Sequence, residues 1–207
     1  MTEPRYPLLA LSRHRMEIDG DGVTTLVAGA GCPLSCAYCI NKTLLRQAPT
    51  LVTAAELYEK VRIDDLYFRA TGGGLTFGGG ESLLHMDFYE TLRPLCPEWR
   101  FAAETSLHVP RADAERAAAL FDQFIVDIKT LDPAVYLAYT GRRPEPAYEN
   151  LALLCRLVGP ERIRVRVPLI PGYNDERDRT RTVEALAAMG LRQIERFPYV
   201  IREDVKP

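Results

Sequence analysis

Three cysteines stand close together near the start of this 207-residue chain, in the spacing C-x3-C-x2-C: Cys32, Cys36 and Cys39. Thiolates are the preferred ligands of the iron atoms in iron–sulfur clusters, and three of them on one short loop can bind three corners of a four-iron cluster. The fourth iron then has no protein ligand and is open to a small molecule. The spacing therefore predicts an iron–sulfur site.

A structural zinc loop, or thiols without any ligand role, is the alternative interpretation. Structural zinc sites need four ligands and favour C-x2-C pairs. Neither His14 nor His85 stands at ligand spacing from the three cysteines. Cys96 and Cys155 stand alone, and an odd total of five cysteines is not the pattern of a secreted disulfide framework. The sequence favours metal ligation over disulfide bonding.

The composition is that of a globular protein, with 47% hydrophobic residues and a formal net charge of -2. No block of Lys and Arg indicates nucleic-acid binding, and no run of 18 apolar residues indicates a transmembrane helix. The N-terminal residues lack the apolar core and cleavage site of an export signal. We therefore expect one cytoplasmic domain over residues 1–207, with no nucleic-acid or membrane partner.

Short β-rich runs alternate with helical patterns, which is typical of βα units and a parallel sheet. Thr53 and Glu56 form a capping box that opens a helix. The predicted strands are Thr24–Ala28, Gly74–Phe77, Arg100–Glu104, Gln123–Ile128, Ile163–Ile170 and Gln193–Pro198. The predicted helices run from Thr53 to about Arg62 and near Met86–Leu95, Arg111–Phe121, Pro146–Val158 and Asp178–Met189. Six such units fit an open partial barrel or a doubly wound sheet.

Side chains that could bind a ligand or take part in catalysis follow the ends of four successive predicted strands. In parallel α/β folds ligands bind at the carboxyl ends of the strands, because loops and helix N-termini converge there. We therefore expect one site, to which these strands contribute Cys32, then Gly79, Gly80 and Glu81, then Glu104 and Thr105, and finally Asp127 and Lys129.

The cysteine loop resembles the hallmark motif of the radical S-adenosylmethionine (SAM) enzymes. The resemblance implies a [4Fe–4S] cluster on Cys32, Cys36 and Cys39, with SAM bound to the unique iron. It further implies that the reduced cluster cleaves SAM to methionine and a 5′-deoxyadenosyl radical, which abstracts hydrogen. Tyr38 matches the aromatic residue that this family places before the last cysteine.

Two glycine-containing segments are similar to those of the activating enzymes of glycyl radical enzymes. Asp19–Thr24 resembles their D-G-P-G-I-R segment, and Gly72–Glu81 resembles their GG-x-T-x-S-GGE segment. The second likeness implies that Gly79, Gly80 and Glu81 meet the amino group of SAM. Glycine suits that position because it allows a close approach of the backbone to a ligand.

The likeness continues into the second half of the chain. Glu104 and Thr105 occupy the place of the family's D-T-N, and Asp127 and Lys129 that of the L-D-L-K of pyruvate formate-lyase activating enzyme. This implies a monovalent cation on Glu104, Thr105 and Asp127, and contact of Lys129 with the SAM carboxylate. Arg166, in a segment like R-x-P-x-I-P-G-x-N-D, is implied to project towards SAM, while Asn174 and Asp175 can cap the following helix.

Together these likenesses imply an α/β fold with a parallel sheet, a partial (β/α)6 TIM-type barrel without a ferredoxin-type insert. They imply a radical SAM oxidoreductase whose substrate is a glycine of a glycyl radical protein, with a flavodoxin- or ferredoxin-type electron donor. Ile40 and Val200 replace two histidines of the family pattern. The alternatives are a stand-alone radical SAM enzyme acting on a small molecule or peptide, and an iron–sulfur electron-transfer module.

Overall fold

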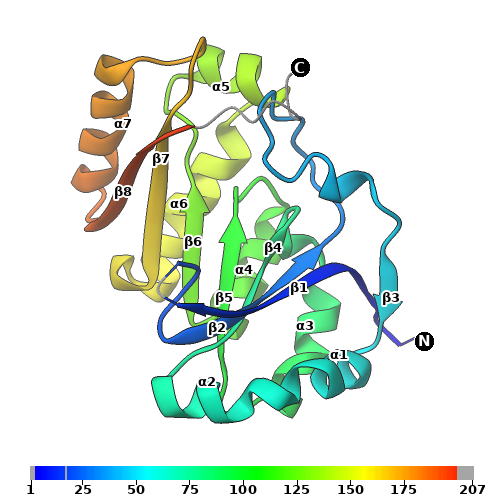
Figure 1. Cartoon of the computed structure of the whole chain (residues 1–207). Helices are drawn as coiled ribbons and strands as arrows, with labels where there is room; N and C mark the ends of the chain where they lie inside the picture. The colour runs from blue at the N-terminus through cyan, green and yellow to red at the C-terminus, as the bar shows by residue number, and fades with distance from the viewer. Residues whose placement is uncertain (1–2, 17, 200–207) are drawn as a thin grey trace.

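The computed structural model describes residues 3–16 and 18–199, which form one mixed sheet flanked by helices (Figure 1). The strands are β1 (Tyr6–Met16), β2 (Val23–Gly29), β3 (Thr50–Val52), β4 (Gly74–Gly79), β5 (Arg100–Thr105), β6 (Gln123–Asp127), β7 (Ile163–Leu169) and β8 (Gln193–Pro198). The α-helices are α1 (Ala54–Val61), α2 (Asp65–Thr71), α3 (Met86–Leu92), α4 (Arg111–Leu120), α5 (Pro133–Thr140), α6 (Glu145–Val158) and α7 (Glu176–Ala188).

The strand order distinguishes the partial barrel from the doubly wound sheet. The order is β3-β1-β2-β4-β5-β6-β7-β8, and every pair from β2 to β8 is parallel. Each new parallel strand is added on the same side of the previous one, whereas a doubly wound sheet reverses direction at a switch point. Right-handed crossovers then place the helices on one face, and Figure 1 shows α4 and α6 behind the strands. The predicted partial (β/α)6 barrel is confirmed; it is open, with β3 and β8 at its edges in the described chain.

The two faces of the sheet differ in chemistry because side chains alternate along each strand. On β5, Phe101 and Ala103 belong to the hydrophobic core under the helices, and on β6 Phe124 and Val126 do the same. The alternate positions on these strands reach Glu104 and Asp127, which are absent from that core. The face away from the helices therefore carries charged side chains towards the carboxyl ends of the strands.

Two strands outside the parallel set were not predicted. β1 pairs antiparallel with both β2 and β3, which extends the sheet beyond the barrel strands. The buried carboxylate of Asp64 helps to hold this extension, because it accepts hydrogen bonds from Arg13 on β1 (2.6 Å) and Thr25 on β2 (2.8 Å). None of the helices that the structure describes is long and apolar enough to cross a membrane.

Candidate active site

The carboxyl ends of the parallel strands meet at one rim, and the residues predicted for the site lie there. The strand register places Gly29 beside Gly79 and Asp127 beside Arg166. The cysteine loop follows β2, the Gly79–Glu81 segment ends β4, Glu104 and Thr105 end β5, and Lys129 follows β6. The four strand ends therefore lie at one rim of the sheet, to which β7 adds Arg166.

The cysteine loop is anchored on both sides of Cys36. The Ser35 N–H donates to the Thr140 carbonyl at 2.8 Å, and the Ala37 N–H donates to the Tyr139 carbonyl at 3.0 Å. Both acceptors lie at the C-terminal end of α5, whose last carbonyls have no partner within their own helix. Figure 1 shows α5 at the same end of the molecule as the loop that follows β2. The position of the loop is therefore set by the fold of the chain.

The three thiols of this loop are free and partly accessible. Cys32 is exposed, whereas Cys36 and Cys39 are half-buried. Although the Cys32 residue is exposed, desolvation of its thiol by the surrounding protein raises the pKa to about 11. Burial also raises the pKa of Cys36, although the nearby Lys129 ammonium works in the opposite direction. Lys129 therefore brings positive charge to a thiol that has to ionise before it can bind iron.

These thiols suit an iron–sulfur cluster better than zinc. Among residues 3–16 and 18–199, no three His, Cys, Asp or Glu side chains are arranged to hold a metal ion as they stand. The three thiols are therefore not preformed for either metal site. A structural zinc site would need a fourth ligand, whereas a cluster needs only three protein ligands. Three free thiols on one anchored loop supply the donor set of a cluster with one iron open to another ligand.

The glycine loop after β4 lies against the start of the cysteine loop. The Gly80 N–H donates to the Gly29 carbonyl at 3.0 Å, and the Glu81 N–H donates to the Gly31 carbonyl at 2.8 Å. A Cβ atom on Gly80 would lie 2.0 Å from the Gly31 carbonyl oxygen, so only glycine fits there. The two loops that resemble the family's cluster and SAM motifs are thus joined by backbone hydrogen bonds.

Asn41 joins the same two loops through its side chain. Its Nδ2 donates to the Gly79 carbonyl at 2.7 Å, whereas the neighbouring Ile40 is exposed. The role of Asn41 was not predicted, because a single Asn after the cysteines carries no specific signal by itself. Val200, the other departure from the family pattern, lies outside the described residues.

Glu81 is buried, and its carboxylate accepts four hydrogen bonds from its own chain. Oε1 accepts from the Leu83 N–H at 3.2 Å and from the Thr105 hydroxyl. Oε2 accepts from the Ser106 N–H at 2.8 Å and from the Ser106 hydroxyl at 2.6 Å. Burial raises the pKa of Glu81 against the effect of these donors. Contact of Glu81 with SAM stays a prediction; in the structure this side chain ties the glycine loop to the end of β5.

The cation site on Glu104, Thr105 and Asp127 stays a prediction, and the structure shows how these three side chains pair within the chain. Arg166 pairs with two of them: its guanidinium lies 3.1 Å from the Glu104 carboxylate and donates from Nε to Asp127 at 2.9 Å. The Thr105 hydroxyl points to Glu81 instead. Asp127 stands directly beside Arg166 in the strand register, so the guanidinium neutralises charge that a metal ion would otherwise have to balance.

Lys129 lies within the same charged group, and its Nζ is 3.4 Å from the Asp127 carboxylate. Burial works against the charged form of Lys129, but Asp127 and the Cys36 thiol outweigh it and raise the pKa of the lysine. Burial likewise opposes ionisation of Asp127, but Lys129 and Arg166 lower its pKa. Lys129 is therefore a cationic side chain near Cys36, where a ligand carboxylate would be attracted.

Three tyrosines surround Tyr38, which lies in the last part of the cysteine loop. The ring of Tyr38 lies 6.2 Å from that of Tyr139, 5.7 Å from Tyr173 and 6.3 Å from Tyr199, measured between ring centroids. The Tyr199 hydroxyl also donates to the Tyr38 carbonyl. Tyr38 was predicted from the resemblance; the other three come from α5, the loop after β7 and the end of β8.

The segment after β7 contains the helix cap that was expected there. The Asp175 side chain accepts from the Asp178 N–H at 2.8 Å and so caps α7. Asn174 instead ties its own loop together, and its Nδ2 donates to the Pro168 carbonyl at 3.1 Å. Capping is confirmed for Asp175, and Asn174 stabilises the turn before it.

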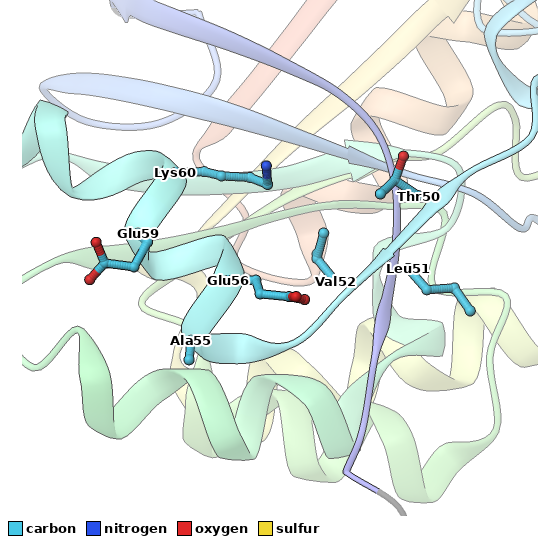
Figure 2. A pocket seen from close by; sticks show the side chains of 7 residues that line it. All are labelled: Thr50, Leu51, Val52, Ala55, Glu56, Glu59 and Lys60. Carbon is cyan, nitrogen blue, oxygen red and sulfur yellow. The ribbon is translucent and has the colours of Figure 1, made fainter.

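A groove of about 500 Å³ lies elsewhere, between β3 and α1, and Figure 2 shows the side chains that line it. One of them, Glu56, is occupied in the cap of α1, where its carboxylate accepts from the Thr53 N–H at 2.8 Å. The groove contains none of the residues predicted for the site; its lining consists of Thr50, Leu51, Val52, Ala55, Glu56, Glu59 and Lys60.

Comparison with known proteins identifies the family. Residues 26–186 match the family model described as the Radical SAM superfamily, so the chain belongs to this superfamily. Among solved structures, Streptococcus suis SuiB bound to S-adenosylmethionine shares the fold, with a TM-score of 0.65 and 15% identity, over 84% of this chain and 40% of SuiB.

The more similar relatives are named activating enzymes. The chain is 28% identical to the pyruvate formate-lyase 2-activating enzyme of Escherichia coli (strain K12), over 87% of this chain and 73% of that enzyme. It is 34% identical to the indoleacetate decarboxylase activating enzyme of Tractidigestivibacter scatoligenes, over 68% of this chain and 45% of that enzyme. A domain of a pyruvate-formate lyase-activating enzyme from Bacteroides vulgatus ATCC 8482 is 26% identical, with a TM-score of 0.53, over 65% of this chain and 88% of that domain. The chain thus spans less than half of the indoleacetate relative.

Proposed function

We propose that this protein is a glycyl radical enzyme activating enzyme that holds a [4Fe–4S] cluster on Cys32, Cys36 and Cys39 and binds SAM beside it. The observation that supports this most directly is the anchored loop of three free thiols, joined by hydrogen bonds to the glycine loop after β4. Together, the cluster and SAM would supply reductive cleavage of SAM and a 5′-deoxyadenosyl radical that abstracts hydrogen.

The charged side chains of the rim have separate roles in this proposal. Lys129 attracts the carboxylate of SAM, since it is held in its cationic form close to Cys36. Arg166 pairs with Glu104 and Asp127, so that these two half-buried carboxylates repel a third one less. The backbone at Gly79 and Gly80 allows the close approach that a bound amino acid moiety requires.

The substrate in this proposal is a backbone glycine of a partner protein. The names of the relatives support it, because they include activating enzymes of pyruvate formate-lyase 2 and of choline trimethylamine-lyase. The open sheet also supports it, since the barrel strands do not close around the rim in the described chain. A flavodoxin- or ferredoxin-type protein would donate the electron.

Metal loading tests the first half of the proposal. We expect anaerobic reconstitution to give about four irons per chain. Replacement of Cys32, Cys36 or Cys39 by Ala should abolish the cluster. The matched controls Cys96→Ala and Cys155→Ala should retain it. Loss of the cluster in a control, with retention in the loop variants, would refute the ligand assignment.

Hydrogen transfer tests the second half. A candidate partner, the glycyl radical enzyme encoded nearest to this chain, is produced with glycine deuterated at Cα. Incubation with the reduced, SAM-bound protein should move deuterium into 5′-deoxyadenosine and leave a doublet radical signal on the partner in electron paramagnetic resonance. Formation of unlabelled 5′-deoxyadenosine without a partner radical would refute the assignment of a protein substrate.

A further inference from the structure

Helix α5 carries a buried tyrosine that no predicted role accounts for. Tyr136 is 1% exposed, and its hydroxyl has no hydrogen-bond partner among residues 3–16 and 18–199. A buried hydroxyl without a partner is unfavourable, because the group gives up its hydrogen bonds to water without replacement. Such a group calls for a physical explanation.

Helix α5, which carries Tyr136, contacts the cysteine loop, and the electrostatic neighbours of the phenol are consistent with this position. Burial raises the pKa of the phenol, and the neighbouring groups that raise it further are Cys36, Tyr148, Glu81 and Cys32. Two of these four are cysteines of the predicted cluster loop. The ring itself is held edge-on against Tyr148, with 5.9 Å between the ring centroids.

The backbone of α5 fixes this arrangement. The carbonyls of Tyr139 and Thr140, three and four residues after Tyr136, accept the hydrogen bonds from the residues on either side of Cys36. The helix that carries Tyr136 is therefore joined to the cysteine loop on both sides of Cys36. The hydroxyl of the neighbouring Tyr139 is also buried without a partner among the described residues, but the Tyr199 phenol lies beside Tyr139 and contributes to its raised pKa.

We infer that the Tyr136 hydroxyl donates a hydrogen bond to a sulfur atom of the cluster bound on Cys32, Cys36 and Cys39. This inference rests on the proposed function. Hydrogen bonds to the sulfurs are among the features that set the reduction potential of an iron–sulfur cluster. A donor stabilises the more negative, reduced state, so Tyr136 raises the potential and makes the cluster easier to reduce.

The test compares Tyr136→Phe with the matched control Tyr148→Phe. The Tyr148 ring packs against Tyr136, but its hydroxyl donates to the Thr130 carbonyl at 2.6 Å. The midpoint potential of the reconstituted cluster is measured without SAM, by a redox titration followed by electron paramagnetic resonance. Loss of the hydrogen bond should shift the ratio of reduced to oxidised cluster about tenfold towards the oxidised form, which is about 59 mV for one electron. Tyr148→Phe should leave the potential unchanged.

Unfolding of the cluster-free protein supplies a second readout. Tyr136→Phe removes no hydrogen bond within the described chain and should not lower the denaturation midpoint, whereas Tyr148→Phe should lower it. An unchanged potential in Tyr136→Phe, an equal shift in both variants, or a lowered midpoint for Tyr136→Phe would overturn the inference.

Iron content distinguishes failure of the inference about Tyr136 from failure of the proposed function. If the wild-type protein binds no cluster, the proposed function fails, whereas a loaded cluster with an unshifted potential overturns the role of Tyr136 alone. If the Tyr136→Phe variant does not bind a cluster, the cluster-loaded wild-type protein is transferred into D2O. Its reduced cluster is then examined by electron paramagnetic resonance for coupling to a deuteron on the Tyr136 hydroxyl. A coupled deuteron supports the hydrogen bond, and its absence overturns the inference.

Discussion

Replacement of Glu81 by Ala should destabilise the fold as well as change the site. The substitution removes the acceptor of four hydrogen bonds, from Leu83, Thr105 and Ser106. The two hydroxyl donors can rotate towards other acceptors, but the N–H groups of Leu83 and Ser106 are fixed in the backbone. A buried N–H group left without a partner costs about 1–2 kcal/mol, so we expect a loss of about 3 kcal/mol in the free energy of unfolding.

Urea unfolding of the cluster-free protein, followed by circular dichroism, measures this loss. With a denaturant slope of about 2 kcal/mol per molar urea, the midpoint should fall by about 1.5 M. The matched control is Glu90→Ala, because the Glu90 side chain is 49% exposed and pairs with Arg116 at the surface. A surface ion pair contributes less than about 1 kcal/mol, so this midpoint should hardly move. Equal midpoints for the two variants would refute the structural role of Glu81.

Three further predictions concern the rim. Gly80→Ala should lose SAM binding in the titration of the cluster-loaded protein, because its Cβ would lie 2.0 Å from the Gly31 carbonyl oxygen; retained affinity would contradict this. Burial raises the pKa of Glu104 from 4.5 to about 7, so the folded protein keeps a proton that the unfolded chain releases, and stability is lost as the pH rises from about 4.5 to 7. Glu104→Gln should remove this part of the pH dependence in urea unfolding, and an unchanged slope would be evidence against it. Lys129→Ala should weaken SAM binding about tenfold in the same titration, whereas the exposed Lys60→Ala should not; equal affinities would count against a role for Lys129.

The sequence predicted the parallel part of the fold because its signals are local. All six predicted strands occur, within one or two residues at most of their ends, and the capping box of Thr53 and Glu56 is present. β1 was missed because register shifts between Leu8 and Ala10 and between Ser12 and Arg15 interrupt its alternation. β3 was missed because three residues are too few to show a period.

Helix α5 was missed for a different reason, although its ends carry usable signals. Its apolar residues do not form one stripe, so no amphipathic pattern marks the helix. Asp132 before Pro133 and Gly141 after Thr140 are nevertheless typical of a helix start and a helix end. These signals mark the two ends of the helix. They do not show that its last carbonyls, and with them Tyr136, lie near the cysteine loop, because that contact depends on the tertiary structure.

The site was predicted as a set of residues, but its internal pairing was not. Strand ends identify which side chains share the rim, since that follows from the βα pattern alone. The pairing of Asp127 with Arg166 depends on which strands are neighbours and on their register. That a guanidinium from β7 pairs with Glu104 and Asp127 was not predicted, because no local pattern in β5 or β6 contains that information.

The anchoring of the cysteine loop has a consequence for the energetics of cofactor loading. α5 holds the loop around Cys36, and the glycine loop after β4 holds its beginning at Gly29 and Gly31. In small zinc domains much of the metal-binding free energy is consumed in ordering the chain. Here most of that ordering is already complete when the chain has folded, so the entropy lost on binding is confined to a few thiol side chains. For the cluster proposed on Cys32, Cys36 and Cys39, the binding free energy would then contribute almost entirely to the stability of the cluster.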